Sequence, residues 1–500
     1  MTVPHYTNYI DGEWSDAAER YEIRSPANNE LVATVAQGTV SDIDRAVAAA
    51  QTAHKSGVWR NTPPEKRASL IHAAATYLEN RAEELAQLQT RENGTTIRIT
   101  QAMHVALSVA QLRYLADLAT TYKFETLGPS IEGPVPADGL VRREPLGVVA
   151  AIVPWNVPLL TAVWKVGAAL SAGNTIVLKP DEHAPLLVLE LVRAFEAAGL
   201  PSGVLNAVVG DGEPVGAHLS SHPDVRKVAF TGSTAVGRSI LKASGDDIKR
   251  VTLELGGKGP NIILDGADLD VAVDNALFAS MANNGQACEA GTRLLVPAER
   301  YDEIVERLVQ RAATLSVGDP LDPATHIGPV VSEVQHKRIV DYIAIAQKEG
   351  AKLAFGGKVP TGEGFDTGYW IEPTIFTGVT NTMRIAREEV FGPVLVAIPY
   401  STIDEAVEIA NDTEYGLSAG IFGPEDTALE IAKRIDAGMV WINEWHVINP
   451  MYPFGGMKQS GLGREGGPDA LDAYTEPKFI ALNRSAGPEQ RAFALVLDPA

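Results

Sequence analysis

Three short clusters in the sequence carry side chains that can act on a carbonyl group. They are Pro154-Trp155-Asn156, Leu253-Glu254-Leu255-Gly256-Gly257 and Gly285-Gln286-Ala287-Cys288. A cysteine thiolate attacks carbonyl carbon, an amide donates to the oxygen that becomes anionic, and a carboxylate takes a proton from water. Each cluster contains Gly or Pro and lies at the end of an expected strand, where α/β folds present catalytic groups.

Cys288 is the only cysteine, and a lone cysteine is commonly a small buried hydrophobe. Its context favours a nucleophile instead. The polar segment Asn283-Asn284-Gly285-Gln286 precedes it and breaks the apolar helical stretch from Val271 to Ala282, unlike the middle of a core element. The side-chain amide of Asn156 and the backbone N–H of Cys288 can then serve as oxyanion donors.

Glu254 ends the apolar run from Val251 to Leu255 and is followed by two glycines. Taken alone, a glutamate at a strand end is most often solvated or in a salt bridge. Beside an apolar crevice, however, its pKa would be raised, and the carboxylate could accept a proton from water near neutral pH. Hydrolysis of a thioester requires such a group.

The segment Phe230 to Gly237 follows an expected strand and opens an expected helix. Gly232 would let the backbone approach a pyrophosphate at the positive end of that helix. A plain β-α turn explains the segment equally well. A formal G-x-G-x-x-G match at Gly461, Gly463 and Gly466 has no β-run before it, so we interpret it as a false positive.

Short β-rich runs alternate with helix-like segments, which predicts two α/β units with parallel sheets. In the first unit the expected helices are Pro185 to Ala198 and Thr234 to Ala243, and the expected strands are Val148 to Val153, Thr175 to Leu178, Val204 to Val209, Lys227 to Phe230 and Val251 to Leu255. In the second unit the expected helix is Tyr301 to Leu315, and the expected strands are Asn261 to Leu264, Arg293 to Val296, Val394 to Pro399, Leu417 to Phe422 and Met439 to Asn443.

Composition and charge exclude several classes of protein. The 500 residues carry a formal charge of 42 − 63 = −21, which disfavours nucleic acid and anionic membranes as partners. The apolar stretch from Gly147 to Leu178 contains Pro154, Asn156 and Lys165, so we expect buried core and no membrane span. One cysteine allows no internal disulfide and fits a reducing cytoplasm. No histidine pair was recognised at a metal-ligand spacing, so no metal is expected.

Six motifs in one order resemble the aldehyde dehydrogenase superfamily over nearly the whole chain. They are Pro154 to Pro158, Phe230 to Ser233, Glu254 to Lys258, Gly285 to Cys288, Glu389 to Pro393 and Pro453 to Gly456. The resemblance implies an α/β fold with a Rossmann-like parallel-sheet cofactor domain, a second α/β catalytic domain and a small β bridging domain. It also implies NAD(P)-dependent oxidation of an aldehyde and a homo-oligomer, for which we expect a tetramer ahead of a dimer.

The domain boundaries follow from the same resemblance. The cofactor domain is expected at 1–127 and 146–256 and the catalytic domain at 257–443. A projecting bridging segment, rich in Gly and Pro, is expected at 128–145 and joined by 475–500, with strand-like Lys478 to Leu482. Residues 444–474 would form a substrate-entrance loop and return to the cofactor domain.

By motif matching, the resemblance implies that Cys288 is the nucleophile, Glu254 the general base and Asn156 the oxyanion donor, while Glu465 and Lys165 move protons. Glu182 would accept both adenine-ribose hydroxyls and repel a 2′-phosphate, so we expect NAD as the preferred cofactor, with NADP left open. The expected cofactor contacts are Ile152, Pro154, Trp155, Lys179, Glu182, Gly212, Phe230, Gly232, Ser233, Val236, Leu255, Gly256, Gln335, Glu389 and Phe391.

The expected substrate pocket is formed by Val157, Thr161, Trp164, Glu289, Trp445 and Phe454. Glu289 departs from the small, apolar or thiol side chain usual after the nucleophile, which favours a more polar pocket or a hydroxylated substrate. Val157 and Thr161 are smaller than the side chains often found there, which predicts a roomy tunnel for bulky or aromatic aldehydes.

Three other functions compete with this interpretation. A CoA-acylating relative would usually lack Glu254. A catalytically silent relative would not need Cys288, Glu254 and Asn156 intact. A cofactor-independent cysteine hydrolase would need a histidine partner for the thiol, and none stands out in the sequence.

Overall fold

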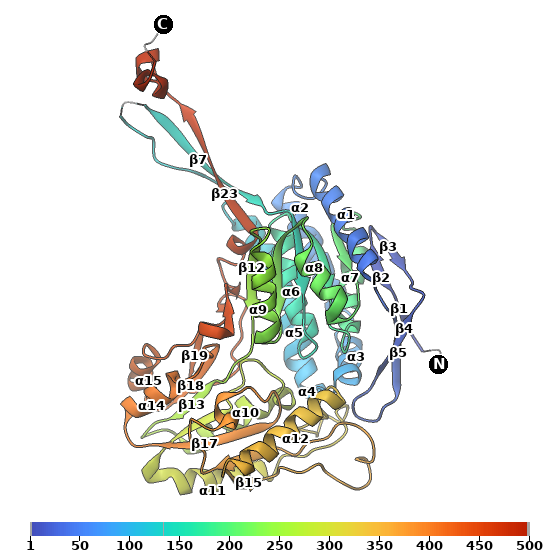
Figure 1. The fold of residues 1–500 in the computed structure, drawn as a ribbon, viewed down its shortest axis with the longest axis vertical. Helices are drawn as coiled ribbons and strands as arrows, with labels where there is room; N and C mark the ends of the chain where they lie inside the picture. The colour runs from blue at the N-terminus through green and yellow to red at the C-terminus, as the bar shows by residue number, and fades with distance from the viewer. Residues whose placement is uncertain (1–2, 134, 498–500) are drawn as a thin grey trace.

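The structure, a computed structural model that describes residues 3–133 and 135–497, consists of two lobes and a projecting arm. Each lobe is built on a β-sheet flanked by helices, and the arm extends from one end of the molecule with the last described residues near its tip (Figure 1). Among the described residues, no helix has the length and apolarity needed to cross a membrane.

The sheet of the first lobe contains the five strands predicted from the alternating pattern. They pair in parallel in the order β12-β11-β8-β9-β10, so β8 is the point from which the chain winds in both directions. Ligands bind at such a switch point, beyond the carboxyl ends of the strands. The bounds are β8 Val148–Ile152, β9 Thr175–Lys179, β10 Leu205–Ala207, β11 Val225–Thr231 and β12 Arg250–Glu254.

Strands that the sequence analysis missed extend both edges of this sheet. At one edge β2 (Asn8–Ile10) pairs antiparallel with β10, and β3 (Glu13–Ser15) follows it. At the other edge β21 (Gly461–Leu462) pairs antiparallel with β12, so the G-x-G-x-x-G match begins on an edge strand and not in a phosphate loop. A separate small sheet contains β1 (His5–Tyr6), β4 (Arg20–Arg24) and β5 (Leu31–Ala36).

Helices cover both faces of the first sheet because alternate strand residues point to opposite sides. Val149 and Ala151 belong to the core under α2, α5, α6 and α7, whereas Val148 and Ala150 belong to the core under α1, α8 and α9. Helix α6 is buried along its whole length, which confirms the prediction of core for this stretch. The bounds are α1 Val40–Ser56, α2 Pro64–Glu79, α3 Ala82–Asn93, α4 Ile97–Ile99, α5 Ala106–Thr121, α6 Pro158–Ser171, α7 Leu186–Ala197, α8 Ala217–Ser221 and α9 Thr234–Ser244.

The second lobe has a sheet in the order β15-β16-β17-β14-β13-β18-β19. The five predicted strands are present, whereas the edge strand β15 and its neighbour β16 were missed. The strand bounds are β13 Pro260–Ile263, β14 Arg293–Pro297, β15 Lys352–Phe355, β16 Thr374–Thr377, β17 Val394–Tyr400, β18 Ser418–Phe422 and β19 Met439–Ile442. The helix bounds are α10 Leu269–Met281, α11 Tyr301–Ala312, α12 Glu333–Lys348, α13 Arg384–Arg387, α14 Ile403–Asn411 and α15 Glu425–Ala432.

The arm is a three-stranded antiparallel sheet in the order β23-β7-β6. Strand β23 (Thr475–Asn483) pairs with β7 (Ala137–Pro145) along its whole length, from Thr475 opposite Pro145 to Asn483 opposite Ala137. The arm begins at β6 (Glu125–Leu127), slightly before the expected boundary at 128. Strand β6 was not predicted because it contains no Gly or Pro that would mark it as part of the arm. Of the segments expected to bridge, residues 134 and 498–500 lie outside the described residues.

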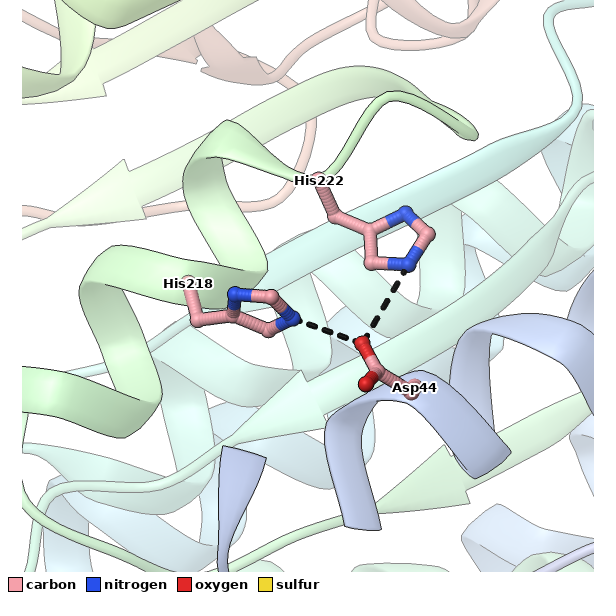
Figure 2. A group of neighbouring side chains, drawn as sticks. All are labelled: Asp44, His218 and His222. Carbon is pink, nitrogen blue, oxygen red and sulfur yellow. Dashed lines mark hydrogen bonds and ion pairs between the residues drawn. The ribbon is translucent and has the colours of Figure 1, made fainter. Parts of the chain in front are cut away.

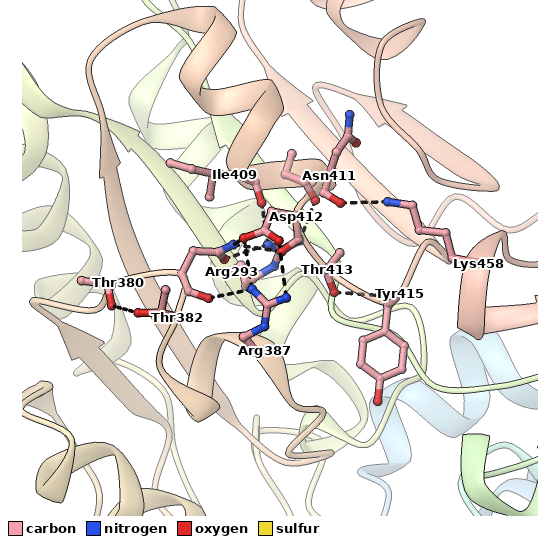
Figure 3. A network of polar contacts seen from close by, with 12 residues as sticks. Arg293, Thr380, Thr382, Arg387, Ile409, Asn411, Asp412, Thr413, Tyr415 and Lys458 are labelled. Carbon is pink, nitrogen blue, oxygen red and sulfur yellow. Dashed lines mark hydrogen bonds and ion pairs between the residues drawn. The ribbon is translucent and has the colours of Figure 1, made fainter.

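A buried arginine fixes the strand that follows Cys288. Arg293, at the start of β14, donates to the carbonyl oxygens of Lys258 at 2.9 Å, Ile409 at 2.8 Å and Ala410 at 2.9 Å. Beside it Arg387 and Asp412 form an ion pair of 3.0 Å (Figure 3). Burial lowers the pKa of Arg293 to about 10, which still leaves the guanidinium charged at neutral pH. These bonds tie β14 to the end of α14.

Candidate active site

A cavity of about 270 Å³ lies between the two lobes and contains most of the predicted site residues. Its walls come from the β8–α6 connection, the end of β12 and the segment before β14. The predicted residues that line it are Pro154, Trp155, Asn156, Val157, Thr161, Trp164, Gly232, Ser233, Glu254, Leu255, Gly256, Cys288, Glu289, Gln335, Glu389, Phe391 and Phe454. The sequence clusters therefore do converge on one space.

The loop before Cys288 is held in an uncommon backbone conformation. Asn283 and Asn284 have φ of 54° and 58°, in the left-handed region that asparagine tolerates. Thr95 donates to the side-chain oxygen of Asn283 at 2.6 Å. Gly285 also has positive φ, and a Cβ there would lie 2.1 Å from the carbonyl carbon of Gly392, so only glycine fits. This packing sets where Cys288 enters the cavity.

Asn156 lies against the same loop. Its side-chain nitrogen donates to the backbone oxygen of Gln286 at 2.8 Å, and the residue is 7% exposed. That bond uses one of the two N–H groups of the amide. The other can donate to an oxygen formed on a carbon bound to Cys288.

Glu254 is the last residue of β12, and its carboxylate is buried. The residue is 2% exposed, and its Oε2 has no hydrogen-bond partner among the described residues. A Cβ at Gly455 would lie 2.6 Å from Oε1, so the glycine leaves room for the carboxylate. Burial, with a smaller contribution from the charge of Glu465, raises the pKa of Glu254 well above its usual value. A carboxyl of this kind exchanges protons closer to neutral pH.

Lys165 and Glu465 form a buried ion pair behind the cavity. The lysine Nζ lies 2.7 Å from the glutamate Oε1, with side-chain exposures of 0% and 2%. Lys165 also donates to the hydroxyl of Thr231 at 2.7 Å, and Thr231 lines the cavity. The pair predicted to move protons is therefore assembled, although neither of its members lines the cavity.

Several groups fit a bound dinucleotide. Lys179 lies 3.2 Å from Glu182 beyond the end of β9. Ser233 caps α9, whose positive N-terminal end faces the cavity side of the sheet. A Cβ at Gly256 would lie 2.4 Å from Oε2 of Glu389, whose Oε1 accepts from the N–H of Gly257 at 2.9 Å. This close approach, which only glycine allows, leaves a carboxylate in the cavity where ribose hydroxyls can reach it.

Two aromatic rings and a glutamine organise the far side of this region. Phe391 has φ of 62° and packs edge-on against Trp155 at 5.3 Å between ring centroids. The side chain of Gln335 donates to the backbone oxygen of Phe391 at 2.7 Å. Gln335 therefore holds the segment that carries Glu389 and Phe391.

Besides Lys179 and Glu182, four predicted cofactor contacts lie outside the cavity lining, two in the core and two on the surface. Ile152 and Phe230 are core residues, and the ring of Phe230 packs beneath Gly232, where a Cβ would lie 2.5 Å from it. Gly212 and Val236 are on the surface, and Val236 is 48% exposed.

Trp445 corrects one prediction about the substrate pocket. It is 1% exposed and does not line the cavity. Its ring fills the space over Gly291 and Gly420, and its Nε1 donates to the backbone oxygen of Glu289 at 3.2 Å. Trp445 therefore supports the wall from behind, because the glycines leave a slot that only a large flat ring fills.

The structure adds lining residues that were not among the predicted site residues. Met103 and His104 belong to a π-helical segment, η1 (Thr100–Val105), that joins α4 to α5, and Leu107 follows it. Such segments often occur at functional sites. Arg338 and Ile448 also line the cavity. A histidine is linked to the thiol through Glu289, because His446 Nδ1 lies 3.0 Å from Oε1 of Glu289 and the thiol contacts Oε2 of the same carboxylate.

The prediction that no two histidines have metal-ligand spacing is wrong. His218 and His222 lie one helical turn apart beside Asp44 (Figure 2). Their Nε2 atoms lie 2.6 Å and 3.6 Å from Oδ1 of Asp44. The N–H of Asp224, however, donates to Nδ1 of His222 at 3.2 Å, so Nε2 of His222 carries the proton and offers a metal no lone pair. The cluster fits a polar link between α1 and α8.

A family model described as the aldehyde dehydrogenase family matches residues 14–480. The chain belongs to the aldehyde dehydrogenase family. The mitochondrial aldehyde dehydrogenase of Rattus norvegicus is 44% identical to it over 483 residues, which cover 95% of this chain and 91% of that one.

Solved aldehyde dehydrogenase structures agree with the fold. An NAD+ complex of the enzyme from Bacillus cereus has a TM-score of 0.93 at 42% identity and covers 96% of this chain and 97% of that one. A betaine aldehyde dehydrogenase from Staphylococcus aureus in complex with NAD+ has a TM-score of 0.93 at 38% identity, with 95% of each chain covered. Membership confirms the predicted fold class and makes this aldehyde dehydrogenase an enzyme of NAD(P)-dependent aldehyde oxidation.

Proposed function

We propose that the enzyme oxidises a bulky or aromatic aldehyde to its carboxylic acid through a thioester on Cys288, with water as the final acyl acceptor. The observation that supports this most is the convergence of Cys288, Asn156 and Glu254 on one cavity. A nucleophile, an oxyanion donor and a general base in that arrangement supply the groups that the protein itself must contribute to thioester formation and hydrolysis, while the oxidation also needs a hydride acceptor.

In the first step the sulfur of Cys288 bonds to the carbonyl carbon and the carbonyl oxygen becomes anionic. The free N–H of the Asn156 amide and the backbone N–H of Cys288 stabilise that oxygen. When bound, NAD supplies the hydride acceptor. Glu389 and Lys179 with Glu182 would hold its two riboses, and the N-terminal end of α9 would face its pyrophosphate.

In the last step Glu254 takes a proton from water as the oxygen attacks the thioester. Only the ionised carboxylate can do this. Because burial raises the pKa of Glu254, its carboxyl group ionises at a higher pH than that of an ordinary glutamate. Lys165 lowers that pKa and limits the effect.

Turnover is expected to require Cys288 and Glu254 and to proceed without added CoA. NADH formation at 340 nm, followed with aliphatic and aromatic aldehydes, should disappear in Cys288→Ala and fall by roughly 100-fold or more in Glu254→Gln. In the wild type kcat should increase with pH across the raised pKa of Glu254. Strict dependence on added CoA would contradict water as the acceptor.

NAD is expected to be preferred over NADP because Glu182 would meet a 2′-phosphate with like charge. Glu182→Ser should increase kcat/KM with NADP by about tenfold, since removing a close repulsion of about 1.4 kcal/mol changes a binding ratio by that factor. The matched change Glu306→Ser, at an exposed position on α11, should leave the ratio unaltered. Equal efficiency of the wild type with both cofactors would refute the preference.

Bulky substrates are expected because small side chains line the wall formed by α6. Val157 and Thr161 face the cavity beside the larger Trp164 and Phe454, whose rings lie 4.7 Å apart. Val157→Phe should therefore raise KM for an aromatic aldehyde such as phenylacetaldehyde about tenfold or more, with little change for acetaldehyde. Parallel changes for both aldehydes would argue against a tunnel limited by Val157.

A further inference from the structure

The thiol of Cys288 makes its hydrogen bond to the next residue in the chain. Its Sγ donates to Oε2 of Glu289 at 3.2 Å, and no other hydrogen bond of this sulfur occurs among the described residues. Glu289 lines the cavity, and its side chain is only 12% exposed. A carboxylate in direct contact with the nucleophile is therefore a built feature of this site and not a surface charge.

The surroundings of Glu289 hold this carboxylate in place. His446 Nδ1 donates to Oε1 at 3.0 Å, while Ser418 and Trp445 donate to the backbone oxygen of Glu289 at 2.8 Å and 3.2 Å. The ring of His446 packs edge-on against Phe278 at 4.9 Å. Its Nε2 is buried and has no hydrogen-bond partner among the described residues.

The two carboxyl groups near the thiol differ in the form that they favour at neutral pH. Burial raises the pKa of Glu254, which favours the protonated acid. Burial would also raise the pKa of Glu289, but the hydrogen bond and charge of His446 more than offset it and leave that pKa below its usual range. His104 faces Glu289 and His446, and Glu389 also acts on the thiol. At neutral pH Glu289 is thus the ionised acceptor in contact with Cys288.

We propose that Glu289 accepts the proton of Cys288 when the thiol attacks the aldehyde, and that His446 is a positioning residue for its carboxylate. The inference rests on the proposed function, in which Cys288 is the nucleophile. In this scheme two carboxylates accept protons: Glu289 takes the proton of the thiol, and Glu254 takes a proton from water.

The proposed step conserves atoms and charge. The Sγ–H bond of Cys288 breaks, its proton goes to Oε2 of Glu289, the sulfur pair bonds to the carbonyl carbon, and the carbonyl π pair moves to oxygen. During hydrolysis the C–Sγ bond breaks, the sulfur regains that pair, and Glu289 returns the proton to it. Glu289 ends the cycle as it began, and the two protons released to solvent both come from the water that attacks the thioester, one through Glu254 and one when the acid product ionises.

A purely electrostatic role for Glu289 predicts the opposite effect. Burial, followed by the charge of Glu289, raises the pKa of Cys288, so removing that charge alone would favour the thiolate and speed the attack. Loss of a proton acceptor would slow it. The variant Glu289→Gln separates the two roles because it keeps the shape and a hydrogen-bond acceptor but cannot take a proton.

The test is stopped-flow NADH formation in the first turnover, for the wild type, Glu289→Gln and Glu254→Gln. At pH 7, Glu289→Gln should slow the first turnover by roughly 100-fold or more, and the deficit should shrink as pH increases because hydroxide then generates the thiolate. Glu254→Gln should keep a first-turnover burst close to wild type and lose the later turnovers. A first turnover that is unchanged or faster in Glu289→Gln overturns the proposal, as does an equal loss of the burst in Glu254→Gln.

Two further variants exclude a general structural effect. Asparagine suits the left-handed backbone at position 446, where φ is 55°. His446→Asn should slow the first turnover by less than Glu289→Gln does, and its deficit relative to the wild type should also shrink as pH increases. Glu306→Gln makes the same chemical change on an exposed helix face and should match the wild type. If the wild type itself forms no NADH, the proposed function fails; if it does and Glu289→Gln equals it at every pH, only this inference fails.

Discussion

The burial of the reacting groups between the two lobes is the physical constraint on which this site depends. The cavity contains Cys288 with Glu254, Glu289 and Glu389, and burial acts to raise the pKa of each of these groups. Desolvation disfavours charge, so whichever groups stay ionised must be held by specific partners. His446 is such a partner for Glu289 and leaves its pKa below the usual range, whereas the N–H of Gly257 only partly offsets the effect of burial on Glu389.

The fold meets this constraint with rigid supports outside the cavity. Arg293 ties β14 to the end of α14, and Gly285 packs against Gly392, so the thiol enters on a fixed loop. Trp445 packs behind Glu289 and donates to its backbone. Lys165 and Glu465 balance each other's charge where an isolated ion would be very costly. Precision in the cavity therefore comes from residues that never line it.

Strand patterns and motif order predicted the two parallel sheets and most of the cavity, because alternation and glycine spacing are local signals. The strands β2, β3, β15, β16 and β21, which lie at or next to the sheet edges, were missed because their short runs carry no clear apolar pattern. His104 and His446 were missed because their place beside Glu289 arises from a π-helical segment and a distant loop, which no sequence spacing encodes. Trp445 was expected to line the cavity but packs behind its wall. The sequence around a tryptophan in a loop is the same whether its ring faces a cavity or packs on two glycines.

The central claim is that an acyl group forms on Cys288 and is released by water that Glu254 activates. The most direct measurement is mass spectrometry of Glu254→Gln mixed with an aromatic aldehyde and NAD and then quenched in acid. The account predicts one acyl group per subunit, carried by the peptide that contains Cys288 and absent when NAD is omitted. An unmodified Cys288 peptide, or an acyl group on any other residue, would contradict it.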